Sequence, residues 1–499
     1  MATVDGPRPA PATVGRKADH IRINLEEDVA AKGITSGFED YRFVPRALPE
    51  IDLDEVSLET DLFGYRLQAP ILISCMTGGT AEAETINRTL AQVAQERRFA
   101  LGLGSARVLL EHPEVFSSFN VRPYAPDVPL LANIGAVQLN RGVTTGDCRR
   151  LVDLLGADAL VLHLNALQEA LQPEGDTTFG GLLRKIEILC HTLGAPVIAK
   201  EVGWGIPPDA VGQLLAAGVS AVDVAGAGGT SWSEVERHRL GSETRQRVAA
   251  AFAGWGLPTA EAVREAHQAH PDALIFASGG IKSGMDASKA IALGAHVAGI
   301  AGPFLRAAAA GVDAALDLAE EHVEVLRTVM FGIGAASLTE LRDTPRLISN
   351  RPPPISVISH TLAYTTRETC EFIDITDDVL GVVAAAGVRN GIVHVHSNHT
   401  TAAIRINENE PYLITDFQRT LRRLIPEENF EHDVMERRPN VPPDEPRNGR
   451  SHCQHLLLSS SESLPIRNAQ MQLGPWQRIF LIELDSSRQR HVTVQVVGH

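Results

Sequence analysis

Residues 159–176 read ALVLHLNALQEALQPEGD, an apolar run that ends in imidazole, amide and carboxylate side chains. Side chains two residues apart share one face of a strand, so we expect His163 and Asn165 to point the same way. Gln168 and Glu169 follow where the strand ends, and they offer an amide and a possible carboxylate ligand for a hard cation. The histidine of a lone His-x-Asn pair is more often a hydrogen-bonded core residue than part of a functional site. The surrounding sequence is therefore needed to decide whether residues 163–169 form a functional site.

The pattern of an apolar run, a small or polar exit and a helix-like segment repeats from residue 69 onward. Eight runs show it, at residues 69–73, 100–104, 130–134, 159–164, 196–201, 221–225, 273–277 and 297–301. Continuously apolar runs are typical of parallel strands that are buried on both faces. Eight consecutive βα units predict an α/β fold in the form of a closed (β/α)8 TIM barrel.

Polar and cationic residues follow several of these runs. The strand-end set is Thr77, Ser105, Arg107, Asn133, Lys200 and Thr230. In TIM barrels the carboxyl ends of the strands form one mouth that carries the chemistry, so these side chains should converge there. This convergence favours a functional site over chance solvation, and residues 163–169 then form one wall of the mouth.

Glycines end the last two runs. Ser278, Gly279 and Gly280 follow the seventh run, and Ala301 and Gly302 follow the eighth. Barrel enzymes commonly bind a phosphate at these two strand ends, through backbone N–H groups and a helix N-terminus. Glycine lets the backbone approach a phosphate closely, so the sequence predicts a phosphorylated ligand or cofactor.

The adjacent Arg16 and Lys17 precede a helix-like stretch near the N-terminus. They are compatible with an ordinary solvated helix face. They also suit an arm that closes over a diphosphate, with Arg as a bidentate fork and Lys as a point charge. The sequence alone leaves both interpretations open.

The chain has 499 residues, which is long enough for at least two domains. Residues 1–15 are rich in Pro and Ala and predict a disordered tail. Residues 16–342 contain the barrel, and the segment DTPRLISNRPPPI at 343–355 predicts a Pro-rich linker. Residues 356–499 mix strand-like and helix-like stretches, which predicts a second, smaller α+β domain at the C-terminus.

Composition excludes several classes of function. No apolar run approaches the length of a bilayer span, and the N-terminal residues lack the apolar segment of a signal peptide, so we expect a cytoplasmic protein. The formal net charge of −16 disfavours non-specific nucleic-acid binding. The five cysteines form no CxxC pair, which argues against a disulfide framework and against a thiolate zinc site.

Residues 16–342 resemble the type 2, FMN-dependent isopentenyl-diphosphate delta-isomerases. The shared segments occur in the family's order and are RKADHI, MTGGT, GSAR, ANIGAVQL, HLNALQEALQPEGD, KEVGWGI, DVAGAGGTSW, ASGGI and AGPFL. The resemblance implies interconversion of isopentenyl and dimethylallyl diphosphate in isoprenoid biosynthesis, by acid–base chemistry of reduced FMN. It also implies NADPH as reductant, Mg²⁺ at the diphosphate and a homo-oligomer. The competing interpretation is a 2-hydroxy-acid oxidase or dehydrogenase, because FMN barrels share their phosphate loops.

The resemblance also implies roles for individual residues. FMN contacts Met76, Thr77, Gly78, Ser105, Asn133, Lys200 and Thr230, with its phosphate at Gly279, Gly280, Ala301 and Gly302. The substrate contacts Arg16, Lys17, Ser105, Arg107, His163, Asn165 and Gln168. Gln168 is the catalytic residue at the reacting end of the substrate, and Glu169 is the Mg²⁺ ligand.

Residues 356–499 resemble a second family, the secondary thiamine-phosphate synthase-like proteins. The shared segments are HTTAAIRINEN, LGPWQRIFLIELD and RHVTVQVVG. Catalysis, ligand binding and assembly all remain open for this domain. His394, His396, His399, His452 and His455 are candidates for a metal or phosphate site, although histidines at such spacing are also ordinary surface residues.

Overall fold

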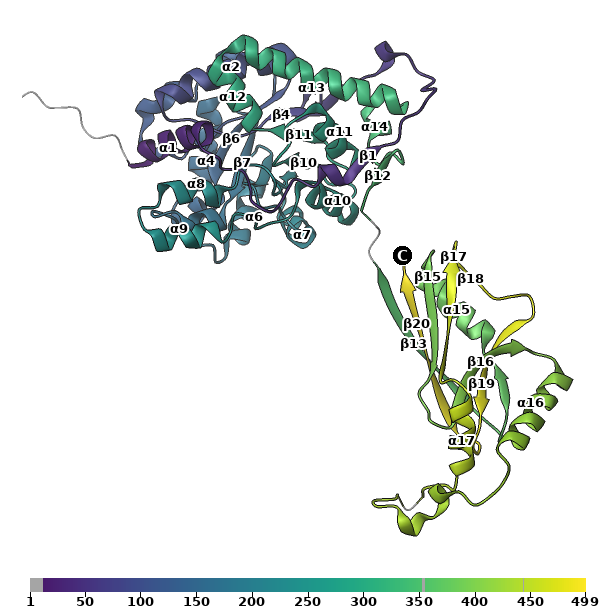
Figure 1. Cartoon of the computed structure of the whole chain (residues 1–499). Coiled ribbons are helices and arrows are strands. Elements are labelled where there is room, and N and C mark those ends of the chain that lie inside the picture. Colours follow the sequence, from purple (N-terminus) through teal and green to yellow (C-terminus); the bar gives the residue numbers. More distant parts are fainter. Residues whose placement is uncertain (1–11, 352–354, 443) are drawn as a thin grey trace, which may run out of the picture. The chain divides into compact units, whose positions relative to one another are not determined.

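The computed structural model describes residues 12–351, 355–442 and 444–499 (Figure 1). The chain forms two compact units, with the division between residues 351 and 352. Of the predicted disordered tail, residues 1–11 lie outside the described part. Residues 12–15 differ from the prediction, because they form the first turn of helix α1 (Ala12–Glu26). Extending an existing helix is far easier than nucleating one, so a helix that starts in the following residues continues into this Ala-containing turn.

Eight parallel strands close into a barrel in the first unit, in the order β10-β11-β4-β5-β6-β7-β8-β9. They are β4 (Ile71–Ile73), β5 (Ala100–Gly102), β6 (Leu130–Gly135), β7 (Ala159–Leu164), β8 (Val197–Glu201), β9 (Ala221–Asp223), β10 (Ile275–Ser278) and β11 (Val297–Ile300). Each strand falls within, or overlaps, one of the eight predicted runs. The predicted TIM barrel is therefore confirmed.

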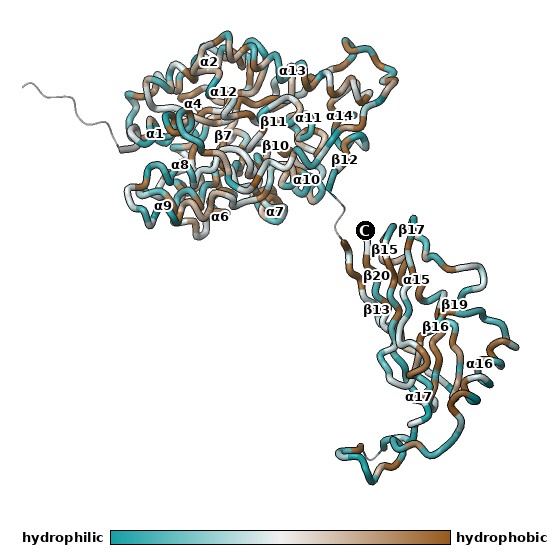
Figure 2. Tube along the Cα trace, viewed as in Figure 1, coloured by the Kyte–Doolittle hydropathy of each residue, from teal (hydrophilic) through white to brown (hydrophobic). Residues whose placement is uncertain are grey.

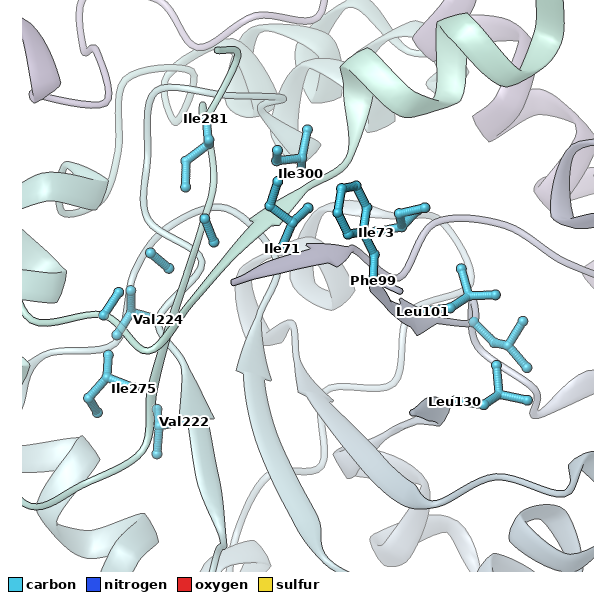
Figure 3. Packing of buried hydrophobic residues seen from close by; sticks show 14 of the residues in the cluster. Ile71, Ile73, Phe99, Leu101, Leu130, Val222, Val224, Ile275, Ile281 and Ile300 are labelled. Carbon is cyan, nitrogen blue, oxygen red and sulfur yellow. The ribbon is translucent and has the colours of Figure 1, made fainter. Parts of the chain in front are cut away.

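The strands are continuously apolar because both of their faces are covered. Ile71 and Ile73 belong to the large core cluster between the barrel and its helices, and Leu72 between them belongs to the cluster inside the barrel. Figure 3 shows Ile71, Ile73 and Leu101 side by side in the outer layer, with Ile275 from a more distant strand. Alternate residues thus enter two different cores, so polar side chains occur only within the last three residues of a barrel strand.

Helices surround the barrel (Figure 1). The longer ones are α2 (Ala81–Arg97), α4 (Thr145–Leu155), α6 (Leu182–Thr192), α7 (Pro208–Ala216), α10 (Thr259–Ala269), α11 (Gly284–Ala292), α12 (Gly302–Ala310) and α13 (Val312–Ile333). Shorter or additional ones are α3 (Val108–Glu111), α5 (Ala166–Leu171), α8 (Trp232–Arg239), α9 (Glu243–Ala250) and α14 (Leu338–Leu341). Among the described residues, no helix combines the length and apolar character that crossing a bilayer requires.

Part of the predicted linker belongs to the first unit. Strand β12 (Leu347–Ser349) pairs antiparallel with β1 (Tyr41–Phe43), and a separate hairpin joins β2 (Thr60–Leu62) and β3 (Tyr65–Leu67). The apolar Leu347 and Ile348 and the ladder hydrogen bonds hold this segment, so the predicted linker begins too early. The three prolines at 352–354 lie outside the described residues.

The second unit contains two antiparallel sheets. One has the order β13-β20-β15-β17-β18 and the other β14-β19-β16. The strands are β13 (Ser356–Thr365), β14 (Phe372–Asp374), β15 (Gly391–Ser397), β16 (Ala402–Glu408), β17 (Ser461–Arg467), β18 (Gln470–Met471), β19 (Gln477–Glu483) and β20 (Gln489–Gly498). The helices are α15 (Thr376–Ala386), α16 (Pro411–Leu424) and α17 (Gly449–Leu457). This is the predicted α+β architecture.

Each sheet of the second unit buries one face under a helix. Val379 and Val383 of α15 pack in one core cluster with Val393 and Val494 from the larger sheet, and Leu421 of α16 packs in another cluster with residues of the smaller sheet. Figure 2 shows the apolar stretches, in brown, following the strands in both units. Alternate side chains of the larger sheet therefore point away from its core, and no helix or strand of residues 355–442 and 444–499 covers the face that they form.

Candidate active site

A cavity of about 460 Å³ lies at the carboxyl ends of the barrel strands, within the size range typical of ligand pockets. Every site residue predicted within residues 16–342 lines it: Arg16, Lys17, Met76, Thr77, Gly78, Ser105, Arg107, Asn133, His163, Asn165, Gln168, Glu169, Lys200, Thr230, Gly279, Gly280, Ala301 and Gly302. These residues come from α1 and from the exits of different strands. The predicted convergence on one mouth is therefore present in the structure.

Helix α1 brings Lys17 to the cavity. Its Nζ donates a hydrogen bond of 2.7 Å to the backbone oxygen of Ser105 and lies 4.8 Å from the centre of the Phe119 ring. Burial, together with the neighbouring charge of Arg16, lowers the pKa of Lys17 to about 7. Lys17 does not lie on a solvated helix face, so the structure favours the alternative in which Arg16 and Lys17 line a site.

His163 is a neutral, oriented side chain in the cavity. Burial lowers the pKa of His163 to about 4, and the charges of Arg16, Lys200 and Lys17 act in the same direction. Its Nδ1 lies 2.8 Å from Asn133 Oδ1, so the proton of the neutral ring sits on Nδ1 and is donated to that oxygen. Gly135 leaves the room for this ring, since a Cβ there would lie 3.0 Å from His163 Nε2.

The Gln168 amide is held at both ends. Its Oε1 accepts a hydrogen bond of 3.1 Å from Asn165 Nδ2, and its Nε2 donates one of 2.9 Å to Glu236 Oε1. Gln168 and Asn165 are buried, and Glu236 is fully buried on α8. The arrangement fixes which end of the amide is the acceptor, so the side chain has one orientation.

Glu236 anchors this network and was not predicted from the sequence. Besides Gln168, it accepts hydrogen bonds from His20 Nε2 at 3.1 Å and from Arg239 at 2.6 Å. Burial alone would raise the pKa of Glu236, but the hydrogen bond and charge of His20, with Gln168 and Arg239, hold it at about 2. Glu236 is therefore a permanent carboxylate. Only its position in a helix-like segment four residues after Trp232 was visible in the sequence.

Glu169 and Asn165 offer oxygen atoms of the kind that Mg²⁺ prefers. The Glu169 carboxylate accepts from Asn165 Nδ2 at 2.9 Å and from the backbone N–H of Asp176 at 2.6 Å. Asn165 Oδ1 is buried and has no hydrogen-bond partner. Nowhere in the described parts of the chain do three or more His, Cys, Asp or Glu residues group as a complete cation site. The residues fit Mg²⁺ that takes its remaining ligands from water and substrate phosphate, as Mg²⁺ commonly does.

Lys200 is buried with two partners that sequence reasoning missed. Its Nζ lies 2.8 Å from Asp223 Oδ2 and donates to Ser278 Oγ at 2.7 Å. Ser278 in turn donates to Asp223 Oδ1 at 2.6 Å. The ion pair offsets the cost of burying the ammonium group, and it holds that group at the wall of the cavity.

The glycines that follow the sixth and seventh strands form a cradle in which a side chain would not fit. A Cβ on Gly279, whose φ is +96°, would lie 2.0 Å from the Gly226 oxygen, and a Cβ on Gly229 would lie 2.5 Å from the Gly280 nitrogen. Helix α12 begins beside them at Gly302. Glycine backbone that a ligand can approach closely and a helix N-terminus are both suited to binding a phosphate. The residues therefore fit the phosphate end of FMN.

The candidate histidines of the second unit do not gather into one site. The rings of His394 and His396 are stacked with 6.2 Å between their centres, whereas His399 Nε2 accepts from the backbone N–H of His491. His455 instead bonds to Ser460. Since no group of three metal-type ligands occurs in the described residues, the structure lends no support to a metal site here.

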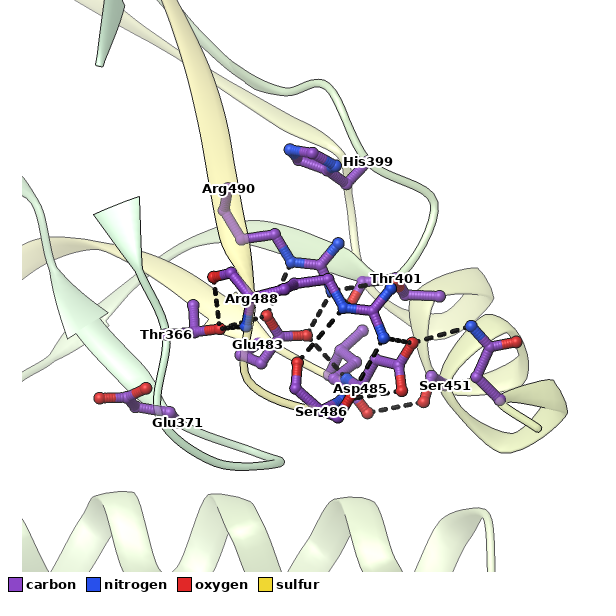
Figure 4. Close-up of polar contacts among 12 residues, drawn as sticks. Thr366, Glu371, His399, Thr401, Ser451, Glu483, Asp485, Ser486, Arg488 and Arg490 are labelled. Atoms are coloured by element: carbon purple, nitrogen blue, oxygen red, sulfur yellow. Dashed lines mark hydrogen bonds and ion pairs between the residues drawn. The ribbon is translucent and has the colours of Figure 1, made fainter. Parts of the chain in front are cut away.

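The polar centre of the second unit is a buried ion pair (Figure 4). Arg490, 2% exposed, donates through Nε at 2.7 Å to the carboxylate of Glu483, which is fully buried. Thr366 donates to the same carboxylate, and Arg490 also donates to Thr401. The pair closes a hydrogen-bond network between strands of the two sheets.

Two family models match the chain. FMN-dependent dehydrogenase matches residues 14–111 and 163–349, and UPF0047 protein YjbQ-like matches residues 360–499. The predicted fusion of an FMN barrel with a second, unrelated domain is confirmed. The UPF0047 match gives the second unit a family without a named activity.

Curated relatives match the first unit over nearly their whole length. An isopentenyl-diphosphate delta-isomerase of Nostoc sp. (strain PCC 7120 / SAG 25.82 / UTEX 2576) is 50% identical over 335 residues, which cover 67% of this chain and 96% of that protein. The isopentenyl-diphosphate delta-isomerase of Rickettsia peacockii (strain Rustic) is 48% identical over 328 residues, covering 66% of this chain and 96% of that protein.

Solved structures match each unit separately. A YbjQ-like protein of unknown function from Sulfolobus solfataricus P2 is 30% identical and covers 29% of this chain and 100% of its own, with a TM-score of 0.27. A mandelate oxidase variant is 20% identical and covers 67% of this chain and 98% of its own, with a TM-score of 0.47.

Proposed function

Since the chain belongs to the isopentenyl-diphosphate delta-isomerases, we propose that its barrel interconverts isopentenyl diphosphate and dimethylallyl diphosphate with FMN as cofactor. The observation that carries the proposal is the Gln168 amide, buried in the mouth and fixed by hydrogen bonds at both ends. Moving a double bond by one carbon requires a proton to reach one carbon and to leave another, without net redox change. An oriented neutral side chain beside the reacting carbons suits that task.

The cofactor-holding residues are those of the predicted FMN set. Met76, Thr77, Gly78, Ser105, Asn133, Lys200 and Thr230 line the cavity and would hold the ring and ribityl parts, and Gly279, Gly280, Ala301 and Gly302 would hold the phosphate. Reduced by NADPH, bound FMN supplies a ring nitrogen that can donate and accept a proton. The buried charge of Lys200, kept by Asp223, stabilises negative charge on the ring side of the mouth.

The substrate diphosphate binds to the cationic and amide side of the mouth, where Arg16, Lys17, Arg107, His163 and Asn165 line the cavity together with Ser105. With its pKa at about 7, Lys17 is only partly charged before an anion arrives. A diphosphate beside it favours the protonated form. Binding of the substrate therefore completes the charge of its own site, and Glu169 would hold a Mg²⁺ ion whose charge would offset that of the phosphates.

Gln168 positions the alkene rather than acting as an acid, because a neutral amide has no suitable pKa. Asn165 and Glu236 restrict its rotation. Helix α1 lines the cavity beside them and excludes water from the reacting carbons. The protein thus orients the substrate, supplies charged groups for its diphosphate and excludes water from the reacting carbons.

The direct test is anaerobic incubation of the purified protein with FMN, NADPH, Mg²⁺ and isopentenyl diphosphate. Dimethylallyl diphosphate should appear, and omission of FMN or of NADPH should stop its formation. FMN-dependent oxidation of a 2-hydroxy acid without isomerisation would instead support the competing oxidase interpretation.

Exchange of Glu236 for Gln should lower kcat by roughly 10-fold or more, because an amide has one acceptor oxygen and its NH2 group must then oppose either Arg239 or the pair His20 and Gln168, which disturbs the orientation of the Gln168 amide. FMN affinity, measured by fluorescence quenching, should not change. Since the pKa of Glu236 is about 2, its carboxylate is charged throughout the working pH range, so the acid limb of the pH–rate profile should also keep its midpoint. A shifted acid limb in E236Q would mean that Glu236 titrates during turnover.

Exchange of Glu169 for Gln should raise the Mg²⁺ concentration needed for half-maximal activity by about 10-fold or more, since a carboxylate ligand is replaced by a neutral amide. Glu187→Gln on α6, which removes a partly exposed carboxylate outside the cavity, is the matched control. An unchanged Mg²⁺ titration of Glu169→Gln would remove Glu169 from the metal site.

A further inference from the structure

The loop between α5 and α6, residues 172–181, brings a carboxylate to the diphosphate side of the mouth. The Asp176 side chain is 16% exposed and lies 3.4 Å from Arg107 Nη1 and 3.0 Å from Arg141 Nε. It also accepts a hydrogen bond of 3.2 Å from Gln138 Nε2. Arg107 and Gln138 line the cavity, whereas Asp176 does not. Asp176 therefore contacts the Arg107 guanidinium from outside the cavity.

The backbone of this loop fixes the position of the Asp176 carboxylate. The N–H of Asp176 donates to the carboxylate of Glu169 at 2.6 Å. A Cβ on Gly175 would lie 1.7 Å from the backbone oxygen of Glu169, so the chain passes too close there for any other residue. Further along the loop, Asn140 Nδ2 donates to the backbone oxygen of Thr178 at 2.7 Å. The loop is held on both sides of Asp176, which makes its carboxylate a fixed acceptor.

Arg107 needs such an acceptor, because a free arginine side chain has many rotamers. Its other carboxylate partner is Glu111, whose side chain is 46% exposed and whose Oε1 lies 3.3 Å from Arg107 Nε. An exposed pair of this kind constrains a side chain only weakly. Within the described ranges, Arg107 Nη2 has no hydrogen-bond partner in the protein. Asp176 thus binds one end of the guanidinium, and Nη2 remains available to a ligand.

We propose that Asp176 is a positioning residue for the substrate diphosphate, which it serves by holding the Arg107 guanidinium against the cavity. This inference rests on the proposed function. An arginine–phosphate contact depends on the orientation of the planar guanidinium as well as on its charge. Two guanidiniums, of Arg107 and Arg141, surround one carboxylate, so the group as a whole stays positive and attracts an anion.

The test compares two carboxylates that contact the same arginine. Asp176→Asn and Glu111→Gln each remove one negative charge beside Arg107, so charge alone would strengthen the binding of an anion in both variants. Isothermal titration calorimetry of the full-length, FMN-loaded proteins with inorganic pyrophosphate, with Mg²⁺ present throughout, measures the affinity without turnover. We expect Asp176→Asn to bind pyrophosphate about 10-fold more weakly than the wild-type chain, because the orientation of Arg107 is lost. Glu111→Gln should bind it at least as tightly as the wild-type chain.

Equal or tighter binding of pyrophosphate by Asp176→Asn would overturn the proposal, since the carboxylate would then be a neutral neighbour or a competitor of the ligand. Binding too weak to detect in the wild-type chain would overturn it as well. Isomerase assays add a second measurement: Asp176→Asn should raise KM for isopentenyl diphosphate and leave kcat within about two-fold. Because calorimetry needs no turnover, a wild-type chain that binds pyrophosphate but forms no dimethylallyl diphosphate would count against the proposed function alone.

A double-substitution cycle tests whether Asp176 acts through Arg107. If it does, Arg107→Met/Asp176→Asn should bind pyrophosphate no more weakly than Arg107→Met, because the group that Asp176 positions is already absent. A further loss of about 10-fold in the double variant would show that Asp176 acts independently of Arg107, and would overturn the proposal. FMN fluorescence quenching should be the same in all of these proteins, which verifies that the barrel is folded.

Discussion

Gln168→Ala is expected to lower kcat for isomerisation by about 100-fold or more, with a much smaller effect on KM. The side chain lines the cavity but carries no charge, and the substitution leaves Arg16, Lys17 and Arg107, the proposed partners of the diphosphate, in place. The decrease should therefore appear in kcat, because the proton-transfer step needs the oriented amide beside the reacting carbons. Steady-state assay under anaerobic conditions, with reduced FMN, separates the two parameters.

Gln213→Ala on α7 is the control for this substitution, because the residue is exposed and lies outside the cavity. FMN binding should be the same in the wild-type chain and in both variants. Full turnover by Gln168→Ala would show that the hydrogen-bonded amide has no part in the reaction, and a loss confined to KM would make it a binding residue only.

Much of the barrel was predictable because its strands obey a simple rule. Ile71, Leu72 and Ile73 are all apolar since alternate residues enter two different cores. Polar residues appear only where a strand leaves both cores, so the ends of the runs also mark the mouth. For the same reason the predicted lining residues are brought together in the structure.

The parts of the site that escaped prediction lie off this pattern. Asp223 ends a strand but reads as an isolated acid, and only its 2.8 Å distance to Lys200 reveals the ion pair. Glu236 lies on α8, and its contact with Gln168 spans 68 residues of sequence. Hydrogen bonds between distant segments follow from tertiary packing, which no local periodicity encodes.

Domain ends were predicted less well than domain contents. The composition of residues 343–355 suggested a linker, yet Leu347 to Ser349 pairs with Tyr41 to Phe43. A three-residue strand is too short to show a periodic pattern in the sequence, and its partner strand lies some 300 positions earlier. For the histidines of the second unit, a local pattern was present but did not produce a site. His394 and His396 do share a strand face, yet they form a stacked pair, and no group of three metal-type ligands occurs in the described residues.

Arg490→Met should be the most destabilising single change in the second unit, at about 3–5 kcal/mol. The guanidinium is the only cation that touches Glu483 in the described residues, and the carboxylate has no exposed surface. Without Arg490 the charge keeps only the Thr366 hydroxyl and the Asp485 backbone N–H as donors. Hydrogen exchange followed by mass spectrometry should show lost protection in β19 and β20.

Peptides from the barrel strands serve as an internal control, because the two units have separate cores and the substitution lies in only one of them. The double variant Glu483→Leu/Arg490→Met should recover most of the loss, since removing both groups leaves no buried charge without a partner. Equal damage in the single and double variants would mean that the hydrogen bonds from Arg490 to Thr401, and not the ion pair, hold the two sheets together. Recovery would instead assign the network to charge neutralisation, with the threonines completing it.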